Sequence, residues 1–176
     1  MKRSCLVLLL IALTLSAITA QDLVNPDNPS IRLSETPGYI TINEFTAGIG
    51  FRDVSPPYAK SFIGFTTIHG YQVNKNFVLG GGTGVLFYKN GPLIPLFIDL
   101  RFSFHTTTIT PYIQGDGGII FNTNGILKLL INPVAGVRYT LSRNVALNLG
   151  AGLWLQTDKS RDSFVNFRLG IVYKPK

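Results

Sequence analysis

The stretch Val145-Ala-Leu-Asn-Leu-Gly-Ala-Gly-Leu-Trp-Leu-Gln156 decides the fold. Its odd-numbered positions are all aliphatic, whereas its even-numbered positions carry Ala, Asn, Gly, Gly, Trp and Gln. Because the side chains of a β-strand point alternately to opposite faces, this pattern predicts a strand with one apolar face and one polar or small face. The same alternation returns between Ser163 and Tyr173 and between Leu93 and Phe104.

Strand-like stretches recur along the chain and are separated by residues typical of turns. No linker or change of composition interrupts them, so residues 39–176 are expected to form one all-β domain. The even number of strands and their short connections favour an eight-stranded antiparallel up-and-down transmembrane β-barrel. The expected strands are Tyr39 to Phe51, Lys60 to Tyr71, Phe77 to Tyr88, Leu93 to Phe104, Thr110 to Phe121, Leu127 to Tyr139, Val145 to Gln156 and Ser163 to Tyr173.

The alternation alone does not distinguish a membrane barrel from a soluble, lipocalin-like barrel. The polar faces of the expected strands are rich in Gly, as at Gly80, Gly82 and Gly84, and carry few Lys or Glu. Small residues suit the crowded interior of a narrow barrel and suit a solvated surface poorly. The apolar faces carry Leu, Ile, Val and Phe along the full strand, as a lipid-facing band must. The membrane alternative is therefore favoured.

The composition agrees with a membrane barrel and argues against a nucleic-acid-binding protein. Charged residues make up 14% of the chain, against about 25% in soluble domains. The formal net charge is +7, but the basic residues are scattered singly along the sequence. A nucleic-acid partner is not expected, because such sites cluster Lys and Arg on one surface. The positive excess suits the anionic head groups of outer-membrane lipid.

The first residues resemble an export signal. A basic start with Lys2 and Arg3 precedes an apolar run from Leu6 to Leu15 and a small-residue ending at Ala20. This arrangement predicts a signal peptide over residues 1–20, cleaved after Ala20. The apolar run is shorter than the about 20 residues that span a bilayer, which disfavours an anchor helix. The single Cys, Cys5, lies inside this segment, so no disulfide is expected in the exported chain.

Residues 21–38 and the connections between strands indicate the topology. Residues 21–38 are polar and contain three prolines, which predicts an extended periplasmic lead segment. Alternate connections, such as residues 74–76 and 142–144, are short, while those between them are on average longer. Bacterial barrels have short periplasmic turns and longer outer loops, so both termini are expected to face the periplasm. The stretches Tyr71 to Val85 and Tyr139 to Leu153 resemble each other, which indicates that both segments perform the same structural task.

Six charged residues fall on the polar face of their strands. An Arg that faces lipid at mid-depth costs about 2–4 kcal/mol, so these side chains are expected inside the barrel. The first interpretation is a network of ion pairs that plugs the lumen, because an eight-stranded barrel is just wide enough for its own side chains. The alternative is a narrow channel or transporter for small solutes or hydrophobic ligands, with a selectivity that these charges set. The six residues are Glu44, Asp99, Arg101, Asp116, Arg138 and Arg168.

The remaining candidates concern the membrane interface and catalysis. Tyr71, Tyr139 and Tyr173 are expected to form an interfacial aromatic girdle at the periplasmic side. Pro133 lies inside an expected strand and predicts a bulge or a local break in the ladder. The two histidines, His69 and His105, do not form a catalytic set with a nucleophile and an acid, so no enzyme activity is expected. No spacing of potential ligands suggests a metal, and no cofactor is expected.

The chain resembles the small outer-membrane β-barrel proteins, in particular the Bacteroidetes-type outer membrane protein β-barrel domain family. The resemblance rests on the turn Tyr71-Gln-Val-Asn-Lys-Asn-Phe-Val-Leu-Gly-Gly-Gly-Thr-Gly84, on its echo at Tyr139 to Gly152, and on the ending Phe167-Arg-Leu-Gly-Ile-Val-Tyr173. It covers about residues 39–176. It implies a place in the cell outer membrane and insertion by the barrel assembly machinery, and it identifies no further protein partner.

Overall fold

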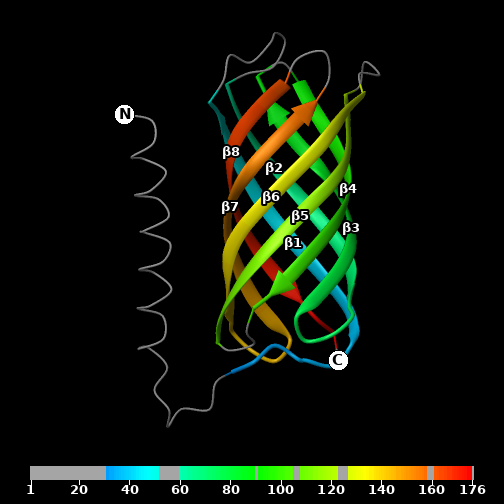
Figure 1. Ribbon diagram of the computed structural model, residues 1–176, viewed down its shortest axis with the longest axis vertical. Helices are drawn as coiled ribbons and strands as arrows, with labels where there is room; N and C mark the ends of the chain where they lie inside the picture. Colours follow the sequence, from blue (N-terminus) through cyan, green and yellow to red (C-terminus); the bar gives the residue numbers. More distant parts are fainter. Residues whose placement is uncertain are drawn as a thin grey trace. The chain divides into compact units, whose positions relative to one another are not determined.

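The computed structural model describes residues 31–51, 60–89, 91–104, 108–122, 127–157 and 161–175. These residues form a closed antiparallel β-barrel of eight strands in sequence order (Figure 1), which confirms the predicted fold class. None of them belongs to a helix long and apolar enough to cross a membrane. The predicted signal peptide, the first part of the lead segment and His105 lie outside the described residues.

Each predicted strand has one counterpart, and no strand end differs from its prediction by more than two residues. Each strand pairs antiparallel with the next one, and β1 closes the barrel by pairing with β8 along most of its length. Closure leaves no unpaired strand edge, which a barrel in lipid requires. The strands are β1 (Gly38–Gly50), β2 (Ser61–Gln72), β3 (Phe77–Tyr88), β4 (Gly91–Ser103), β5 (Ile109–Asn122), β6 (Leu127–Thr140), β7 (Val145–Thr157) and β8 (Arg161–Tyr173).

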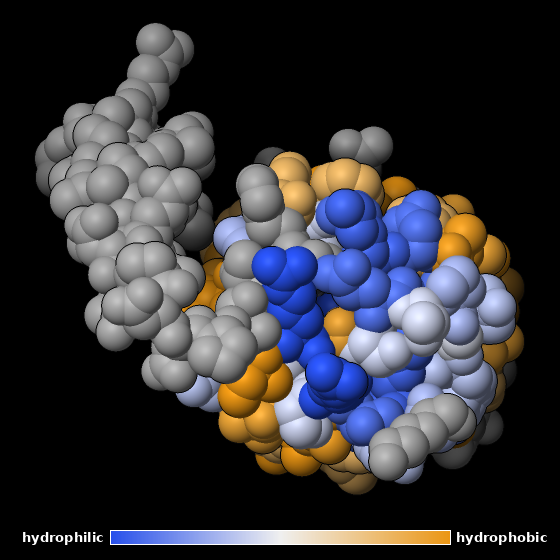
Figure 2. Space-filling model, turned by 90° about the horizontal axis from the view of Figure 1, so that it is seen from below, coloured by the Kyte–Doolittle hydropathy of each residue, from blue (hydrophilic) through white to orange (hydrophobic). Residues whose placement is uncertain are grey.

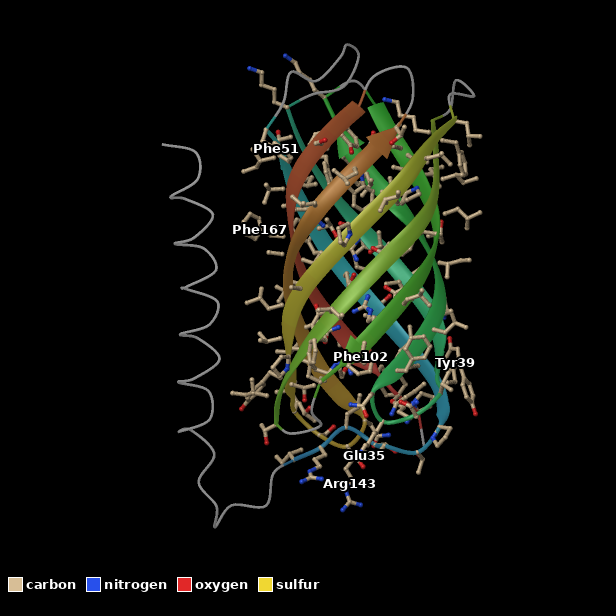
Figure 3. All side chains as sticks on the ribbon, viewed as in Figure 1. Glu35, Tyr39, Phe51, Phe102, Arg143 and Phe167 are labelled. Atoms are coloured by element: carbon tan, nitrogen blue, oxygen red, sulfur yellow. The ribbon has the colours of Figure 1, made fainter. Side chains whose placement is uncertain are left out.

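The alternation of side chains separates a lumen face from an outer face. In β4, Ile98 and Leu100 are 58% and 46% exposed, whereas Asp99 and Arg101 between and beside them are at most 1% exposed. The outer face is therefore largely apolar, whereas the lumen face carries the charged and polar residues, glycines, and buried aliphatic and aromatic side chains such as Ile42, Leu86 and Phe164. Figure 3 shows the outward side chains along the whole barrel, with Phe167 among them. The exterior is apolar in the manner of a lipid-facing band.

Two turns at one end of the barrel have the same pattern of hydrogen bonds. Asn74 Oδ1 accepts the backbone N–H groups of Asn76 and Phe77, and Ser142 Oγ accepts those of Asn144 and Val145. Asn76 and Asn144 then each donate a side-chain N–H to the carbonyl at the end of the next hairpin, on Ser103 and Lys174. The internal repeat thus performs the same structural task twice, as predicted. We call this end of the barrel the turn end and the opposite end the loop end.

Pro133 interrupts the ladder without shifting its register. The β6–β7 pairing passes from Ile131↔Leu155 to Val134↔Gly152 with no paired residues between them, whereas the β5–β6 pairing continues through Gly115↔Pro133. The predicted local break is therefore confirmed on one side of the strand, and no extra residue is inserted. Pro lacks the N–H that the ladder with β7 would use.

The last part of the lead segment lies across the turn end. Residues 31–37 contain no strand or helix, but Ser34 donates its backbone N–H to the Arg143 carbonyl at 2.8 Å. Lys174 Nζ donates to the carbonyls of Ser34, at 2.8 Å, and of Thr36. In Figure 2, which shows this end, hydrophilic residues gather at the mouth and apolar residues surround them. Residues 31–37 thus partly cover the mouth of the barrel.

Two glycines in β3 provide a test of the two faces. A Cβ built on Gly84 would lie 2.2 Å from the Phe65 carbonyl oxygen, whereas one built on Gly81 meets nothing within 4 Å. We expect Gly84→Ala to reduce the free energy of unfolding by about 1–3 kcal/mol, because the backbone of β2 must shift. Gly81→Ala should change it by less than about 0.5 kcal/mol. Urea unfolding in lipid vesicles measures both, and equal losses would contradict this assignment of the faces.

Candidate functional site

The structure places all six predicted charges inside the barrel. Each is at most 6% exposed, and together they come from five of the eight strands. Glu44 lies on β1, Asp99 and Arg101 on β4, Asp116 on β5, Arg138 on β6 and Arg168 on β8. Because β1 and β8 lie across the lumen from β4 and β5, contacts between these pairs of strands cross the barrel.

Arg101 links the two sides of the lumen. Its Nη1 lies 2.8 Å from Glu44 Oε1 on β1, and its Nε lies 2.9 Å from Asp99 Oδ1 on its own strand. The side chains of all three residues are fully buried in the ion pairs. One guanidinium therefore contacts two carboxylates, which suits its planar arrangement of donors.

Arg168 makes the second crossing. Its Nη1 lies 3.0 Å from Glu44 Oε2, and its Nη2 lies 2.6 Å from Asp116 Oδ2 on β5. Glu44 thus stands between two arginines, and Asp116 is bonded from the opposite wall of the barrel. The five side chains Glu44, Asp99, Arg101, Asp116 and Arg168 form one continuous network, which we call the lumen network.

Uncharged side chains complete the lumen network, and sequence analysis did not identify them. Gln114 Nε2 donates to Asp99 Oδ2 and to Asp116 Oδ1, both at 2.8 Å. Asn132 Nδ2 donates to Asp116 Oδ2 at 2.8 Å. Gln114 lies two residues before Asp116, and therefore on the same face of β5. The alternation of side chains along the strand could have indicated it. Lys128 and Lys174 are also buried cations that the search for mid-strand charges missed.

Arg138 lies apart from the lumen network. Its Nε donates to Asn148 Oδ1 at 3.0 Å, and its guanidinium lies 5.9 Å from the centre of the Tyr112 ring. Arg101 approaches the same ring at 5.9 Å. Within the described part of the chain, no carboxylate lies within ion-pair distance of Arg138. Its charge is therefore stabilised by an amide and an aromatic ring.

Glycines on neighbouring strands make room for the lumen network. Glu44 pairs with Gly170, Asp99 with Gly80 and Arg168 with Gly150 across their ladders. A Cβ on Gly170 would lie 2.7 Å from Glu44 Cγ, and one on Gly150 would lie 2.9 Å from Tyr112 Oη. Gly170 thus leaves space for the Glu44 side chain, and Gly150 leaves space for the Tyr112 ring that contacts Arg101.

An aromatic layer fills the lumen toward the loop end. Phe62, Tyr88, Trp154 and Phe164 come from β2, β3, β7 and β8, and three of them contact Phe62 at ring-centre distances of 5.0–5.5 Å. Gln156 Nε2 on β7 donates to Tyr88 Oη at 2.8 Å across the lumen. Trp154 is fully buried and lies 5.8 Å from the Arg168 guanidinium, so this layer rests on the lumen network.

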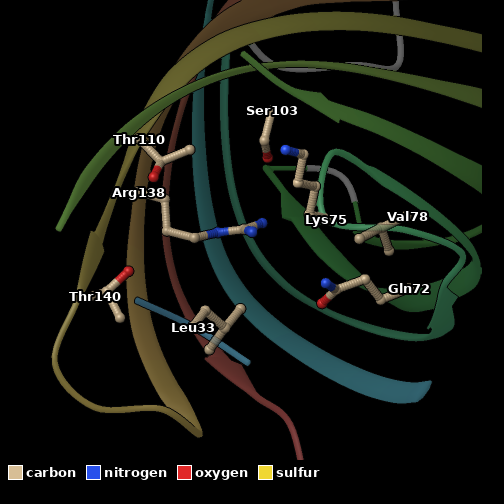
Figure 4. A pocket seen from close by; sticks show the side chains of 8 residues that line it. All are labelled: Leu33, Gln72, Lys75, Val78, Ser103, Thr110, Arg138 and Thr140. Atoms are coloured by element: carbon tan, nitrogen blue, oxygen red, sulfur yellow. The ribbon is translucent and has the colours of Figure 1, made fainter. Parts of the chain in front are cut away.

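A small cavity remains at the turn end. Its volume is about 20 Å³, which suits roughly one water molecule. Figure 4 shows Arg138 and Lys75 at its wall beside Leu33 of the lead segment. Lys174 closes the mouth nearby, and burial lowers the pKa of its ammonium group. Its bonds to the carbonyls of Ser34 and Thr36 oppose this effect, because they favour the charged form.

The three predicted girdle tyrosines lie on the outer face. Tyr71, Tyr139 and Tyr173 are about half exposed near the turn end. Tyr39, which sequence analysis did not include, lies at the same end on β1 (Figure 3) and bonds His69 Nδ1 through its hydroxyl group. His69 is thus an exposed residue of the outer face. Among the described residues, no three His, Cys, Asp or Glu side chains are placed to hold a metal ion.

The comparisons with known proteins show the fold alone. No family model and no curated protein matches the chain. Neisserial surface protein A has a TM-score of 0.61 at 14% identity, over 80% of this chain and 100% of that one. A de novo designed transmembrane β-barrel has a TM-score of 0.52 at 22% identity, over 81% and 100%. The outer membrane protein OprG from Pseudomonas aeruginosa has a TM-score of 0.52 at 9% identity, over 81% and 98%.

These likenesses and the apolar exterior lead to the same conclusion. The chain has the architecture of small outer-membrane β-barrels, and its exterior suits lipid. Together they support a place in the outer membrane.

The lumen network predicts unequal losses for two buried arginines. Arg168→Met should reduce the free energy of unfolding by about 3–5 kcal/mol, because it leaves Glu44 and Asp116 without this partner. Arg138→Met removes a cation that has no carboxylate partner among the described residues, and should cost clearly less. Urea titration of both variants in the same lipid, against the unsubstituted barrel, measures the difference. A loss at Arg138 equal to that at Arg168 would contradict the assignment of the pairs.

Proposed function

We propose that this protein is an integral outer-membrane barrel with a structural or interaction role and a plugged lumen. The observation that carries the proposal is the pair of crossing contacts, from Arg101 to Glu44 and from Arg168 to Asp116. They join opposite walls of the barrel at mid-lumen, where a channel would need open space. A continuous lumen lined by small residues would have favoured the channel alternative.

Two further layers support a closed lumen. The aromatic layer around Phe62 and Trp154 fills the lumen on the loop side of the lumen network, and residues 31–37 lie across the mouth on the turn side. An ion that crosses the barrel would have to displace the aromatic layer and the lumen network and to pass residues 31–37. Breaking the middle layer alone would leave buried charges without partners.

The orientation and the partners belong to the same proposal. The turn end would face the periplasm, because bacterial barrels place their short turns there. Both ends of the exported chain would then be periplasmic, and Tyr71, Tyr139 and Tyr173 would lie at the inner interface as an aromatic girdle. We propose outer-membrane lipid and the barrel assembly machinery as partners, and membership of the Bacteroidetes-type barrel family. No catalytic role is proposed, since His69 lies on the outer face with Tyr39 and Thr67 as neighbours.

Planar-bilayer recording of refolded residues 21–176 tests the plug. A heat-modifiable gel shift first establishes that the barrel has folded. We expect no stable conductance steps from the unsubstituted chain, and rare or no steps from Arg168→Ala, because the aromatic layer remains. Arg168→Ala combined with Trp154→Ala should give steps more often than Arg168→Ala alone, with the Arg101–Glu44 contact and residues 31–37 still in place.

The matched control is Leu149→Ala, which truncates an outward side chain on β7 and should stay silent. Stable steps from the unsubstituted folded barrel would overturn the plug and favour the channel alternative.

A further inference from the structure

Hydrogen-bonding side chains interrupt the apolar exterior at one place. They lie on the outer faces of the neighbouring strands β1, β2 and β3 and are half-buried or exposed. Away from the strand ends, the described outward positions of β4 to β8 carry only Leu, Ile, Val, Phe, Ala, Gly and Pro. We call the interruption the polar face, and its members are Thr41, Asn43, Thr67, His69 and Thr83.

The register shows that the polar face is one continuous patch. Asn43 pairs with Thr67, which pairs with Thr83 on its other side. One step toward the turn end, Thr41 pairs with His69, which pairs with Gly81. Asn43, Thr67 and Thr83 lie near the middle of their strands, so a barrel that spans the membrane carries them at the depth of the hydrocarbon.

Lipid is an unfavourable neighbour for this patch. Hydrocarbon offers no hydrogen-bond partner, so placing an unsatisfied polar group there costs free energy. His69 is partly satisfied by Tyr39 and by Thr67 Oγ1, the latter at 3.4 Å. In the described part of the chain, the side chains of Asn43 and Thr83 make no hydrogen bond. A protein surface with donors and acceptors would satisfy them.

The chemistry of the patch favours a second copy of the same chain. An amide and a hydroxyl each offer both a donor and an acceptor, and the patch carries no carboxylate or ammonium that would repel its own copy. Two barrels that keep the same orientation in a membrane can be related by a two-fold axis along the membrane normal, which brings the same patch of each together.

The order of residues across the patch suits such an axis. Asn43 lies on one side of Thr67, and Gly81 and Thr83 lie on the other. A two-fold axis through the middle therefore sets the Asn43 amide of one copy toward the Gly81 and Thr83 side of the other. Space beside Gly81 is open, since a Cβ there meets nothing within 4 Å. The small residue permits the close approach that membrane interfaces use.

We propose that the polar face of β1–β3 is the interface of a two-fold symmetric dimer of this chain in the membrane. The inference rests on the proposed function, in which the barrel spans the outer membrane and acts by interaction. It names the surface and the partner for that interaction.

The first test measures association of refolded residues 21–176 in lipid vesicles, by energy transfer between labelled copies across a range of protein-to-lipid ratios. We expect the unsubstituted chain to dimerise. The triple variant Asn43→Leu, Thr67→Val and Thr83→Val should associate about tenfold more weakly, because it removes the interfacial hydrogen bonds and adds no bulk. The matched control Leu149→Val, on the outer face of β7, should leave association unchanged.

The second test uses two glycines of the same hydrogen-bonded row. Gly81 and Gly117 both pair with Ile98, both face outward, and neither has an atom within 4 Å of an added Cβ. Residues 21–176 contain no Cys, so Gly81→Cys and Gly117→Cys each provide a single thiol. A short bis-maleimide should link copies through position 81 and leave position 117 largely unlinked.

The outcomes separate this inference from the proposed function. Equal linking at both positions, or a heat-modifiable barrel that stays monomeric in vesicles, would overturn the dimer and leave the plugged barrel intact. If the barrel is monomeric and the triple variant has a higher free energy of unfolding, the dimer is wrong. The polar face would then contact lipid or bind a different protein. A chain that fails to insert into vesicles at all would overturn the proposed function instead.

Discussion

The structure depends on the burial of opposite charges inside a barrel whose exterior is hydrocarbon-like. A charge on a mid-strand position has two possible surroundings, lipid or lumen, and lipid is the costlier for Arg. Once Glu44, Arg101, Asp116 and Arg168 point inward, each needs a partner at short range, because these side chains are buried from solvent. The contacts of 2.6–3.0 Å meet that need, and two of them, from Arg101 to Glu44 and from Arg168 to Asp116, cross the lumen.

The small residues of the lumen follow from this constraint. Gly170 stands beside Glu44 because a Cβ there would clash with the Glu44 side chain, and Gly80 and Gly150 leave space for Ile68 and Tyr112 at the same levels as Asp99 and Arg168. The aromatic layer then fills the lumen on the loop side of the lumen network, and residues 31–37 partly cover the mouth at the turn end. The same alternation gives the barrel its apolar exterior, and the aliphatic and aromatic side chains that point inward, such as Phe62 and Trp154, fill the rest of the lumen.

The sequence was sufficient for the strands and for the direction of the six charges, because both depend on a period of two residues. It did not identify which carboxylate each arginine meets, since Arg168 and Asp116 are brought together by barrel closure and not by local sequence. Gln114 and Asn132 were missed because they carry no charge. The position of residues 31–37 depends on Lys174, far away in the chain, and no local pattern indicates it. The polar face was also overlooked, because its residues are scattered among strands that pair only in the folded barrel.

The closed lumen depends most directly on the contact between Arg168 and Asp116. A double-mutant cycle measures it, with Arg168→Met, Asp116→Asn and the double variant compared by urea unfolding in vesicles. If the two side chains meet as in the structure, the free-energy changes should be non-additive, with a coupling above about 1 kcal/mol. Additive changes, within about 0.5 kcal/mol, would mean that the pair does not cross the lumen and would contradict the account.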